Sequence, residues 1–384
     1  MSIPGYAGYI LYVDLTSRRT WKEPLDPEWA RTFLGGQGIN FRLIYDLVPP
    51  LVDPFSPENA LVFGSGPFSG TLVPGSSELI VSTKLPLTGG FGANSGGGAF
   101  NLMLKSSGYD HLVITGASER PVYLTIRDDE VAIRDASDLW GVDSFDTVDE
   151  LRKRHEPSSI VPIGQAGENL VMISVTQIDK GGTVGFCGMP AVMGSKKLKA
   201  VVACKGTKRL EVADPGRLLR LVDQMMQRVI DYKLRPLLLE GGTSSMTVDW
   251  LGEMDRATRN WTEVLPKPAN ALTIVYQGGF GLKEIDEVHK RARKTLACPS
   301  CPVGDKELCF VKEGEYAPMR SYMTDFMGQG GYGGKTALDD HNRAVKLVDT
   351  DNRYGIDHMN FHNTLGLMVY LYEEGIITKE DTGE

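Results

Sequence analysis

The stretch Gly8-Tyr-Ile-Leu-Tyr-Val-Asp-Leu15 is the first of several strand-like segments in the first half of the chain. It is rich in β-branched and aromatic residues, and Thr16-Ser17 follows it as a turn signal, so the pattern predicts a β-strand. Similar short segments, bounded by Gly, Pro, Asp or Asn, recur up to about residue 205. They are Ala60–Phe63, Glu78–Ser82, His111–Thr115, Val122–Ile126, Val131–Ile133, Ile160–Ile163, Val171–Val175 and Leu198–Ala203. We therefore expect a β-rich domain over residues 1–210.

The pattern changes after Ala213-Asp214-Pro215. Asp214 is a plausible N-cap residue with a proline at the first helical position, and apolar residues then recur at helical spacing. Ile285–Lys294, Ala337–Asp349 and Leu365–Glu374 also have helical patterns. We expect an α+β fold in which residues 211–384 form a mainly α-helical domain that carries the cysteine cluster described below.

Composition narrows the class of protein. The chain has 384 residues, of which 41% are hydrophobic and 23% are charged, as in ordinary globular proteins with room for two or three domains. A net charge of −8 argues against a nucleic-acid surface, which needs clustered Lys and Arg. No apolar run reaches the roughly 18 residues of a membrane span. With no signal-peptide pattern and five cysteines that fit a reducing compartment, we expect a cytoplasmic protein.

Three of the five cysteines, Cys298, Cys301 and Cys309, fall within twelve residues. Two thiolates separated by two residues can bind one iron or zinc ion, or two corners of an iron–sulfur cluster, from a single turn. Three thiolates are one short of a full ligand set. The fourth ligand is Asp305, a group outside this chain, or absent.

Two glycine-rich segments are candidates for ligand binding. Gly89–Gly98 contains Asn94 and Ser95 among glycines that let a backbone approach phosphate oxygens closely, although it is neither a Walker loop nor a dinucleotide fingerprint. The alternative is a long loop between strands. Asp179–Gly188 is also rich in glycine, and its Cys187 is better explained as a small buried hydrophobic residue than as a metal ligand.

A third segment, Asn352–Asp357, ends a predicted helix at Gly355. The Asp357 carboxylate either accepts two N–H bonds from a ligand or simply caps the next helix. His358 and His362 would lie on one helix face, but without a third ligand they are better explained as ordinary hydrogen-bonded histidines than as a metal site.

Together these segments resemble the aldehyde ferredoxin oxidoreductase family, which includes the tungsten subunit of benzoyl-CoA reductase. The resemblance runs along essentially the whole chain, in the same order. Its motifs are Gly8–Leu15, Phe33–Gly38, Pro57–Asn59, Lys84–Gly89, Ala93–Gly97, Gly108–Asp110, Ile163–Asn169, Ala191–Lys196, Cys298–Cys301 and Tyr354–Asp357.

The resemblance implies a tungsten or molybdenum atom held by two pterins, a [4Fe-4S] cluster, and oxidation of an aldehyde to a carboxylic acid. Electrons would pass to ferredoxin or to an iron–sulfur partner subunit. The β-rich domain would be the base on which the two pterins lie. The pterin-binding residues implied are Asn94, Ser95, Gly96, Gly97, Thr183, Gly185, Ile356 and Asp357. The cluster ligands implied are Cys298 and Cys301, with Asp305 where the third cysteine usually stands and Cys309 one helical turn beyond it.

The chain also departs from the family pattern. Glu78, Gly182 and Phe186 stand where members commonly have Arg, which removes positive charge from the vicinity of cofactor phosphates. Asn352 replaces the first Asp of the ring-binding motif. Members usually continue beyond the position of Glu384 through a further helical domain, which is either a separate polypeptide or missing from this sequence. Lys346 and Asp349 replace a metal-binding Glu and His of one family dimer, so homodimerisation is only a family expectation.

Three hypotheses follow. The first is an oxidoreductase of this family. The second is a cofactor-less structural or assembly subunit, which the charge changes favour. The third is a small iron–sulfur or zinc protein that uses only the cysteines, and it leaves the glycine-rich segments unexplained. No catalytic side chain can be named from the sequence.

Overall fold

The computed structural model describes residues 3–241, 256–258, 263–265, 293–322, 331–332, 335–336, 338 and 341–383. It confirms the α+β fold with a β-rich N-terminal part. The chain forms two compact units, and the predicted division near residue 210 stays a prediction. The first unit comprises Met1–Arg228 with Cys298–Pro302 and Asn352–Ile356, and the second comprises Val229–Ala297, Val303–Asp351 and Asp357–Glu384.

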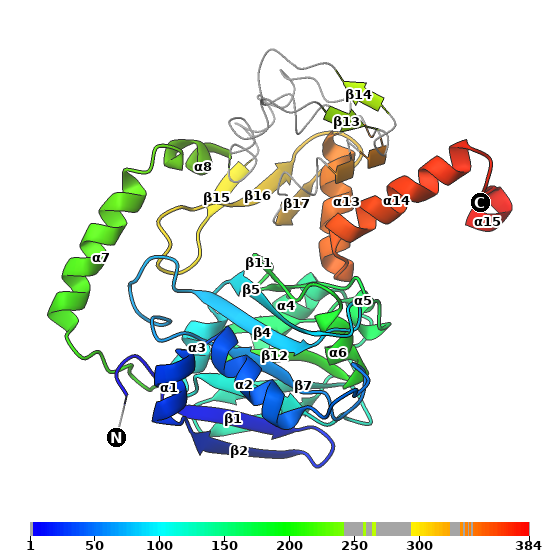
Figure 1. The fold of residues 1–384 in the computed structure, drawn as a ribbon. Coiled ribbons are helices and arrows are strands. Elements are labelled where there is room, and N and C mark those ends of the chain that lie inside the picture. Colours follow the sequence, from blue (N-terminus) through cyan, green and yellow to red (C-terminus); the bar gives the residue numbers. More distant parts are fainter. Residues whose placement is uncertain are drawn as a thin grey trace. The chain divides into compact units, whose positions relative to one another are not determined.

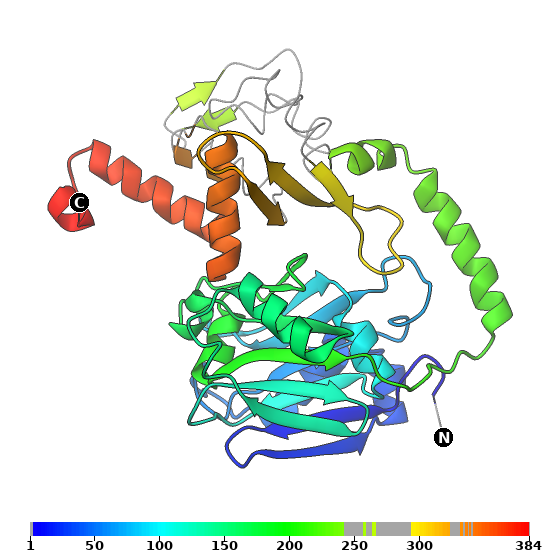
Figure 2. The ribbon, with the colours of Figure 1, turned by 180° about the vertical axis from the view of Figure 1, so that it is seen from behind.

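The strands before Pro215 form two main sheets, which Figures 1 and 2 show from opposite sides. The six-stranded sheet has the order β2-β1-β6-β3-β4-β5, the four-stranded sheet has the order β8-β7-β12-β9, and β10 and β11 form a hairpin. The strands are β1 (Tyr9–Asp14), β2 (Arg19–Pro24), β3 (Leu61–Gly64), β4 (Glu78–Lys84), β5 (Phe91–Gly97), β6 (His111–Thr115), β7 (Val122–Arg127), β8 (Glu130–Asp135), β9 (Ser158–Pro162), β10 (Thr176–Ile178), β11 (Gly182–Val184) and β12 (Leu198–Cys204).

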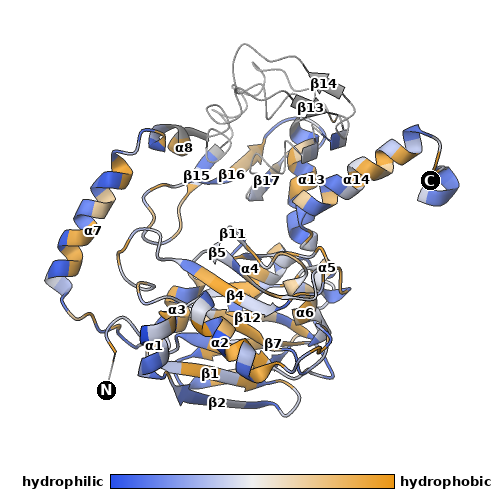
Figure 3. Cartoon of the chain, viewed as in Figure 1, coloured by the Kyte–Doolittle hydropathy of each residue, from blue (hydrophilic) through white to orange (hydrophobic). Residues whose placement is uncertain are grey.

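Strand alternation explains how the first unit packs. Leu11 and Val13 of β1 join a core shared by both sheets, in which Leu124 and Val201 represent the smaller sheet. Ile10, on the opposite face of β1, packs with a separate cluster that includes helix residues. Successive side chains of a strand point to opposite faces, so a strand that is apolar at every position is buried on both sides. Figure 3 shows the contrast between apolar β1 and the fully exposed, hydrophilic β2 at the sheet edge.

Two of the helices in the first part pack on the outer faces of the sheets. α2 (Gln37–Leu47) packs on the six-stranded sheet, and α4 (Ser144–His155) packs on the four-stranded sheet. The others are α1 (Pro27–Phe33), α3 (Phe100–Ser106), α5 (Gln165–Glu168), α6 (Met189–Ser195) and α7 (Pro215–Ile230). α7 begins as the sequence predicts, because the backbone N–H of Arg217 donates to the Asp214 carboxylate at 2.8 Å.

The second unit contains more strand than the sequence predicts. A sheet of order β15-β16-β17 is formed by β15 (Arg293–Leu296), β16 (Lys306–Val311) and β17 (Met319–Tyr322), and β13 (Arg256–Thr258) pairs with β14 (Glu263–Leu265). The helices are α8 (Arg235–Gly241), α13 (His341–Tyr354), α14 (His358–Glu373) and α15 (Lys379–Thr382).

The three later helical predictions have different outcomes. The predicted helix Ile285–Lys294 is wrong at its C-terminal end, because Arg293 and Lys294 lie in β15, and its residues 285–292 lie outside the described residues. The other two are confirmed with shifted bounds. α13 begins at His341 rather than in the region of Ala337, and α14 contains most of the predicted segment but begins earlier, at His358. None of the helices in the described ranges is long and apolar enough to cross a membrane.

Candidate functional site

The first glycine-rich segment is a strand rather than a loop, so the loop alternative is wrong. β5 is the last strand of the six-stranded sheet and pairs with β4 in an antiparallel register that places Asn94 opposite Val81, Ser95 opposite Ile80 and Gly97 opposite Glu78. Because neighbouring residues of a strand point to opposite faces, the side chains of Asn94 and Ser95 lie on opposite faces of the sheet.

The structure brings the two glycine-rich segments together. The Asn94 amide donates to the Phe186 carbonyl at 3.4 Å. A Cβ added at Gly96 would lie 2.6 Å from the Thr183 carbonyl oxygen, closer than real Cβ contacts allow. Gly185 has φ of +94°, a conformation that favours glycine. Glycine at these positions therefore allows β5 and the β11 segment to touch.

Most of the third segment, Asn352–Ile356, belongs to the first unit and is attached to it through its backbone. Ile356 forms an isolated antiparallel bridge with Ser174, and the N–H of Val175 donates to the Gly355 carbonyl at 2.8 Å. The side-chain oxygen of Asn352 accepts a bond from Gln177 at 3.0 Å. The side chain of Asn352 therefore contacts Gln177 inside the chain, through an oxygen that Asp would also provide.

Asp357 is the N-cap of α14. Its carboxylate accepts the Met359 N–H at 3.0 Å and the Asn360 amide at 2.5 Å, and the residue is 3% exposed. The capping alternative is confirmed. Contact with a pterin ring stays a prediction.

The cysteines fall in different settings. Cys298 and Cys301 are half-buried in one turn, in which the Cys301 N–H donates to the Cys298 carbonyl at 3.1 Å and Ser300 adopts φ of +59°. Cys309 is buried in β16, so its expected place one helical turn beyond Asp305 is wrong. Asp305 and Cys309 belong to the second unit, whereas Cys298 and Cys301 belong to the first. Within the described residues, no group of three or more His, Cys, Asp or Glu side chains could hold a metal ion.

A buried titratable cluster in the second unit escaped the sequence analysis. The Tyr332 hydroxyl donates to the Asp351 carboxylate at 2.7 Å, and the Tyr332 ring meets the His362 ring edge-on at 4.2 Å between centroids. Burial raises the pKa of Asp351 to about 6 and lowers the pKa of His362 to about 3. Only the spacing of His358 and His362 signalled this cluster in the sequence.

Comparison with known proteins identifies the family of this chain. The family model for the aldehyde ferredoxin oxidoreductase N-terminal domain matches residues 10–205, and the model for domains 2 and 3 matches residues 220–384. The chain belongs to the aldehyde ferredoxin oxidoreductase family.

Several relatives in this family cover almost the whole chain. The tungsten-containing aldehyde ferredoxin oxidoreductase of Pyrococcus abyssi is 32% identical over 99% of this chain and 60% of its own length. The WOR-like subunit of the aliphatic sulfonate oxidoreductase of Pyrococcus furiosus is 30% identical over 98% of this chain and 61% of its own length. The chain thus spans about three fifths of these relatives.

A solved structure shares the fold. The active-site complex of benzoyl coenzyme A reductase bound to 1,5-dienoyl-CoA matches with a TM-score of 0.84 and 29% identity, over 98% of this chain and 57% of that chain.

Proposed function

We propose that this chain is a subunit of a tungsten-dependent oxidoreductase that oxidises an aldehyde to a carboxylic acid or carries out a related low-potential redox reaction. The observation that carries the proposal is the convergence of β5 with the β11 segment, inside the region that matches the family's N-terminal domain. The tungsten-containing relatives support it.

The backbone around β5 fits a pterin. An edge strand of small residues lets a flat ring approach closely, and Asn94, Ser95 and Thr183 add side-chain donors and acceptors. Gly96, Gly97 and Gly185 would shape this surface, with Ile356 and Asp357 on the third segment. When bound, a tungsten bis-pterin supplies the redox and oxygen chemistry, and the chain's residues position it and exclude water.

The backbone near β5 suits the pterin rings. The side chains near β5 suit the cofactor phosphates less well, because they lack positive charge. Glu78, opposite Gly97, is exposed, and Phe186 is 38% exposed. Neither can neutralise a phosphate. This observation favours the second candidate function, a cofactor-less structural or assembly subunit.

We propose that electrons leave through ferredoxin or an iron–sulfur partner subunit, in keeping with the WOR-like subunit among the relatives. A [4Fe-4S] cluster would use Cys298 and Cys301, with Asp305 or Cys309 as further ligands. We also propose a cytoplasmic location.

The test is the metal and pterin content of anaerobically purified protein, produced alone and together with its genomic neighbours. Tungsten or molybdenum with about four irons per chain supports the proposal. Protein free of tungsten, molybdenum and iron in both preparations contradicts it and supports the cofactor-less subunit.

A matched pair of variants tests the site itself. Gly96→Ala places a Cβ against the Thr183 carbonyl, whereas Gly90→Ala meets nothing closer than 3.8 Å. We expect Gly96→Ala to lose bound pterin while circular dichroism shows a retained fold, and Gly90→Ala to keep it. Equal pterin content in the two variants would contradict the placement of the cofactor at β5.

A further inference from the structure

The six-stranded sheet ends in β5 on one side and in β2 on the other, and every residue of β2 is exposed (Figure 1). The sequence of this strand is Arg19-Thr-Trp-Lys-Glu-Pro24. An edge strand presents N–H and C=O groups to which a strand of another chain can add. Because β2 and β5 lie at opposite ends of the sheet, this edge is separate from the proposed cofactor site.

The pairing with β1 shows which backbone groups of β2 point outward. The Leu25 N–H donates to the Gly8 carbonyl at 2.9 Å, and this bond continues the antiparallel register of the two strands. Hydrogen-bonded and non-hydrogen-bonded pairs alternate along an antiparallel ladder, so Trp21, at an even spacing from Leu25, also bonds to β1. Thr20 and Lys22 therefore direct their N–H and C=O groups away from the sheet.

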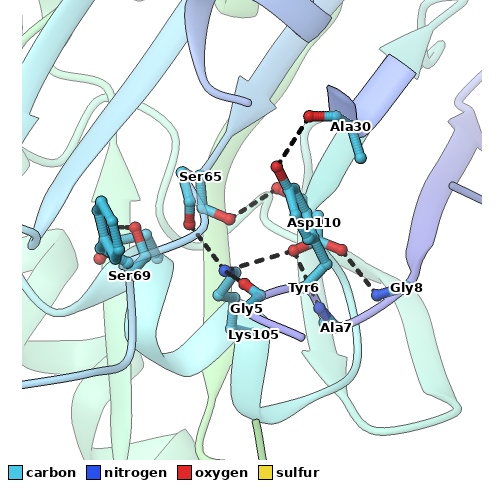
Figure 4. A network of polar contacts seen from close by, with 12 residues as sticks. Gly5, Tyr6, Ala7, Gly8, Ala30, Ser65, Ser69, Lys105 and Asp110 are labelled. Carbon is cyan, nitrogen blue, oxygen red and sulfur yellow. Dashed lines mark hydrogen bonds and ion pairs between the residues drawn. The ribbon is translucent and has the colours of Figure 1, made fainter. Parts of the chain in front are cut away.

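Buried contacts hold the strand in position. Asp110 accepts the N–H groups of Ala7 and Gly8 at 3.0 and 2.7 Å (Figure 4), and Gly8 in turn accepts the bond from the end of β2. Further along the strand, the Trp21 ring stacks on the Tyr12 ring of β1 at 5.2 Å between centroids. The edge is therefore preorganised, which lowers the entropic cost of pairing.

One face of β2 carries a row of complementary side chains. Arg19, Trp21 and Glu23 lie on the same face, because side chains alternate along a strand. The Arg19 guanidinium lies 5.8 Å from the centroid of the Trp21 ring, and the Trp21 indole N–H donates to the Glu23 carboxylate at 3.0 Å. Neither Arg19 nor Glu23 has an ion-pair partner within the part of the chain that the structure describes. The row thus has a cation at one end and an anion at the other.

We propose that two copies of this chain associate by antiparallel pairing of their β2 strands, with a two-fold axis at Trp21. Thr20 of each copy then exchanges two backbone hydrogen bonds with the partner's Lys22. Trp21 faces the partner's Trp21, and Arg19 lies opposite the partner's Glu23. Aromatic pairs and opposite charges in directly opposed positions stabilise a sheet, and the two-fold axis makes each charge pair twice.

Neighbouring registers oppose like charges. An axis at Lys22 would place that ammonium against the partner's Lys22, and an axis at Thr20 would place Lys22 against the partner's Arg18. Like charges directly opposite one another destabilise the pairing. Charged residues and Pro24 also hinder pairing with an arbitrary strand, as on other protected edges. The sequence of β2 therefore favours its own copy in the register centred on Trp21.

The test is sedimentation equilibrium of the full chain at concentrations from about 10 μM to about 1 mM, because a short strand pairing is a small and weak interface. We expect an equilibrium between monomer and dimer. Arg19→Glu and Glu23→Arg each place like charges at two symmetric positions and should weaken the dimer at least about tenfold. The double variant exchanges the two charges and should restore the dissociation constant to within about threefold of the wild type.

Two further variants assign the effect to the edge. Thr20→Pro removes an N–H that points away from β1, so circular dichroism should show a retained fold while the dimer is lost. Asp223→Arg, at an exposed position of α7, should leave the dimer unchanged. A wild-type chain that stays monomeric would leave the edge to a strand of another protein and overturn the proposal. A dimer that both single charge variants leave intact, or that the double variant fails to restore, would also overturn it.

Discussion

Two buried polar clusters, one in each unit, differ in how completely their groups are paired. In the first unit, Asp110 accepts the N–H groups of Ala7 and Gly8 at 3.0 and 2.7 Å and faces the Lys105 ammonium. In the second unit, the Asp351 carboxylate accepts a hydrogen bond from the Tyr332 hydroxyl. The Nε2 atom of His362 has no hydrogen-bond partner among the described residues. A fully paired cluster fixes local structure, whereas a partly paired one leaves groups free to titrate.

The largest effect is expected from breaking the first cluster. Asp110→Ala leaves a buried ammonium without its counter-charge and two N–H groups without an acceptor, so the free energy of unfolding should fall by about 3–5 kcal/mol. Chemical denaturation measures this. Asp129→Asn, which breaks the exposed Lys22–Asp129 pair, is the control and should cause no measurable change. Equal losses in both variants would contradict the comparison.

The second cluster should make stability depend on pH. The pKa of Asp351 is raised to about 6 in the folded state, above the value of about 4 for an unfolded Asp. Between these values the folded state holds a proton that the unfolded state releases, so the contribution of Asp351 to stability falls as pH rises from about 4 to about 6.

The variant Asp351→Asn lacks this dependence. The free energy of unfolding of the variant should equal that of the wild type at pH 4. At pH 7 it should be higher than that of the wild type by about 2–3 kcal/mol. Denaturation curves of both proteins across this pH range measure the difference. His362 titrates in both proteins, so its opposite effect on stability cancels in the comparison. A difference that stays constant with pH would contradict the assignment.

The smallest effect is expected from the hydroxyl that connects Tyr332 to Asp351. The hydrogen bond from the Tyr332 hydroxyl favours the ionised form of the Asp351 carboxylate. Tyr332→Phe should therefore raise the pKa of Asp351 further and lower the free energy of unfolding by about 1 kcal/mol at pH 7. Carboxyl NMR titration measures the pKa. Tyr370→Phe, at an exposed position of α14, is the control, and a shift of equal size there would show that the hydroxyl bond is not the cause.

Local patterns predict the apolar, clearly bounded strands of the first unit. They miss the exposed β2 and the glycine-rich β5, and the predicted strand Val171–Val175 is wrong, because only Ser174 forms an isolated bridge there. β1 and the start of α7 lie where the sequence places them. The same patterns miss the strands of the second unit, since β15 and β16 contain charged residues and lack clear alternation. The expectation of a helix around Cys309 is wrong for the same reason.

The sequence by itself determined the α+β class, the family resemblance and the candidate site segments, because strand alternation, capping residues and ordered motifs are local properties. Only the tertiary structure decided that Gly96 meets Thr183 and that Asp357 caps α14. These facts depend on how segments are placed against one another after folding, which no local pattern encodes.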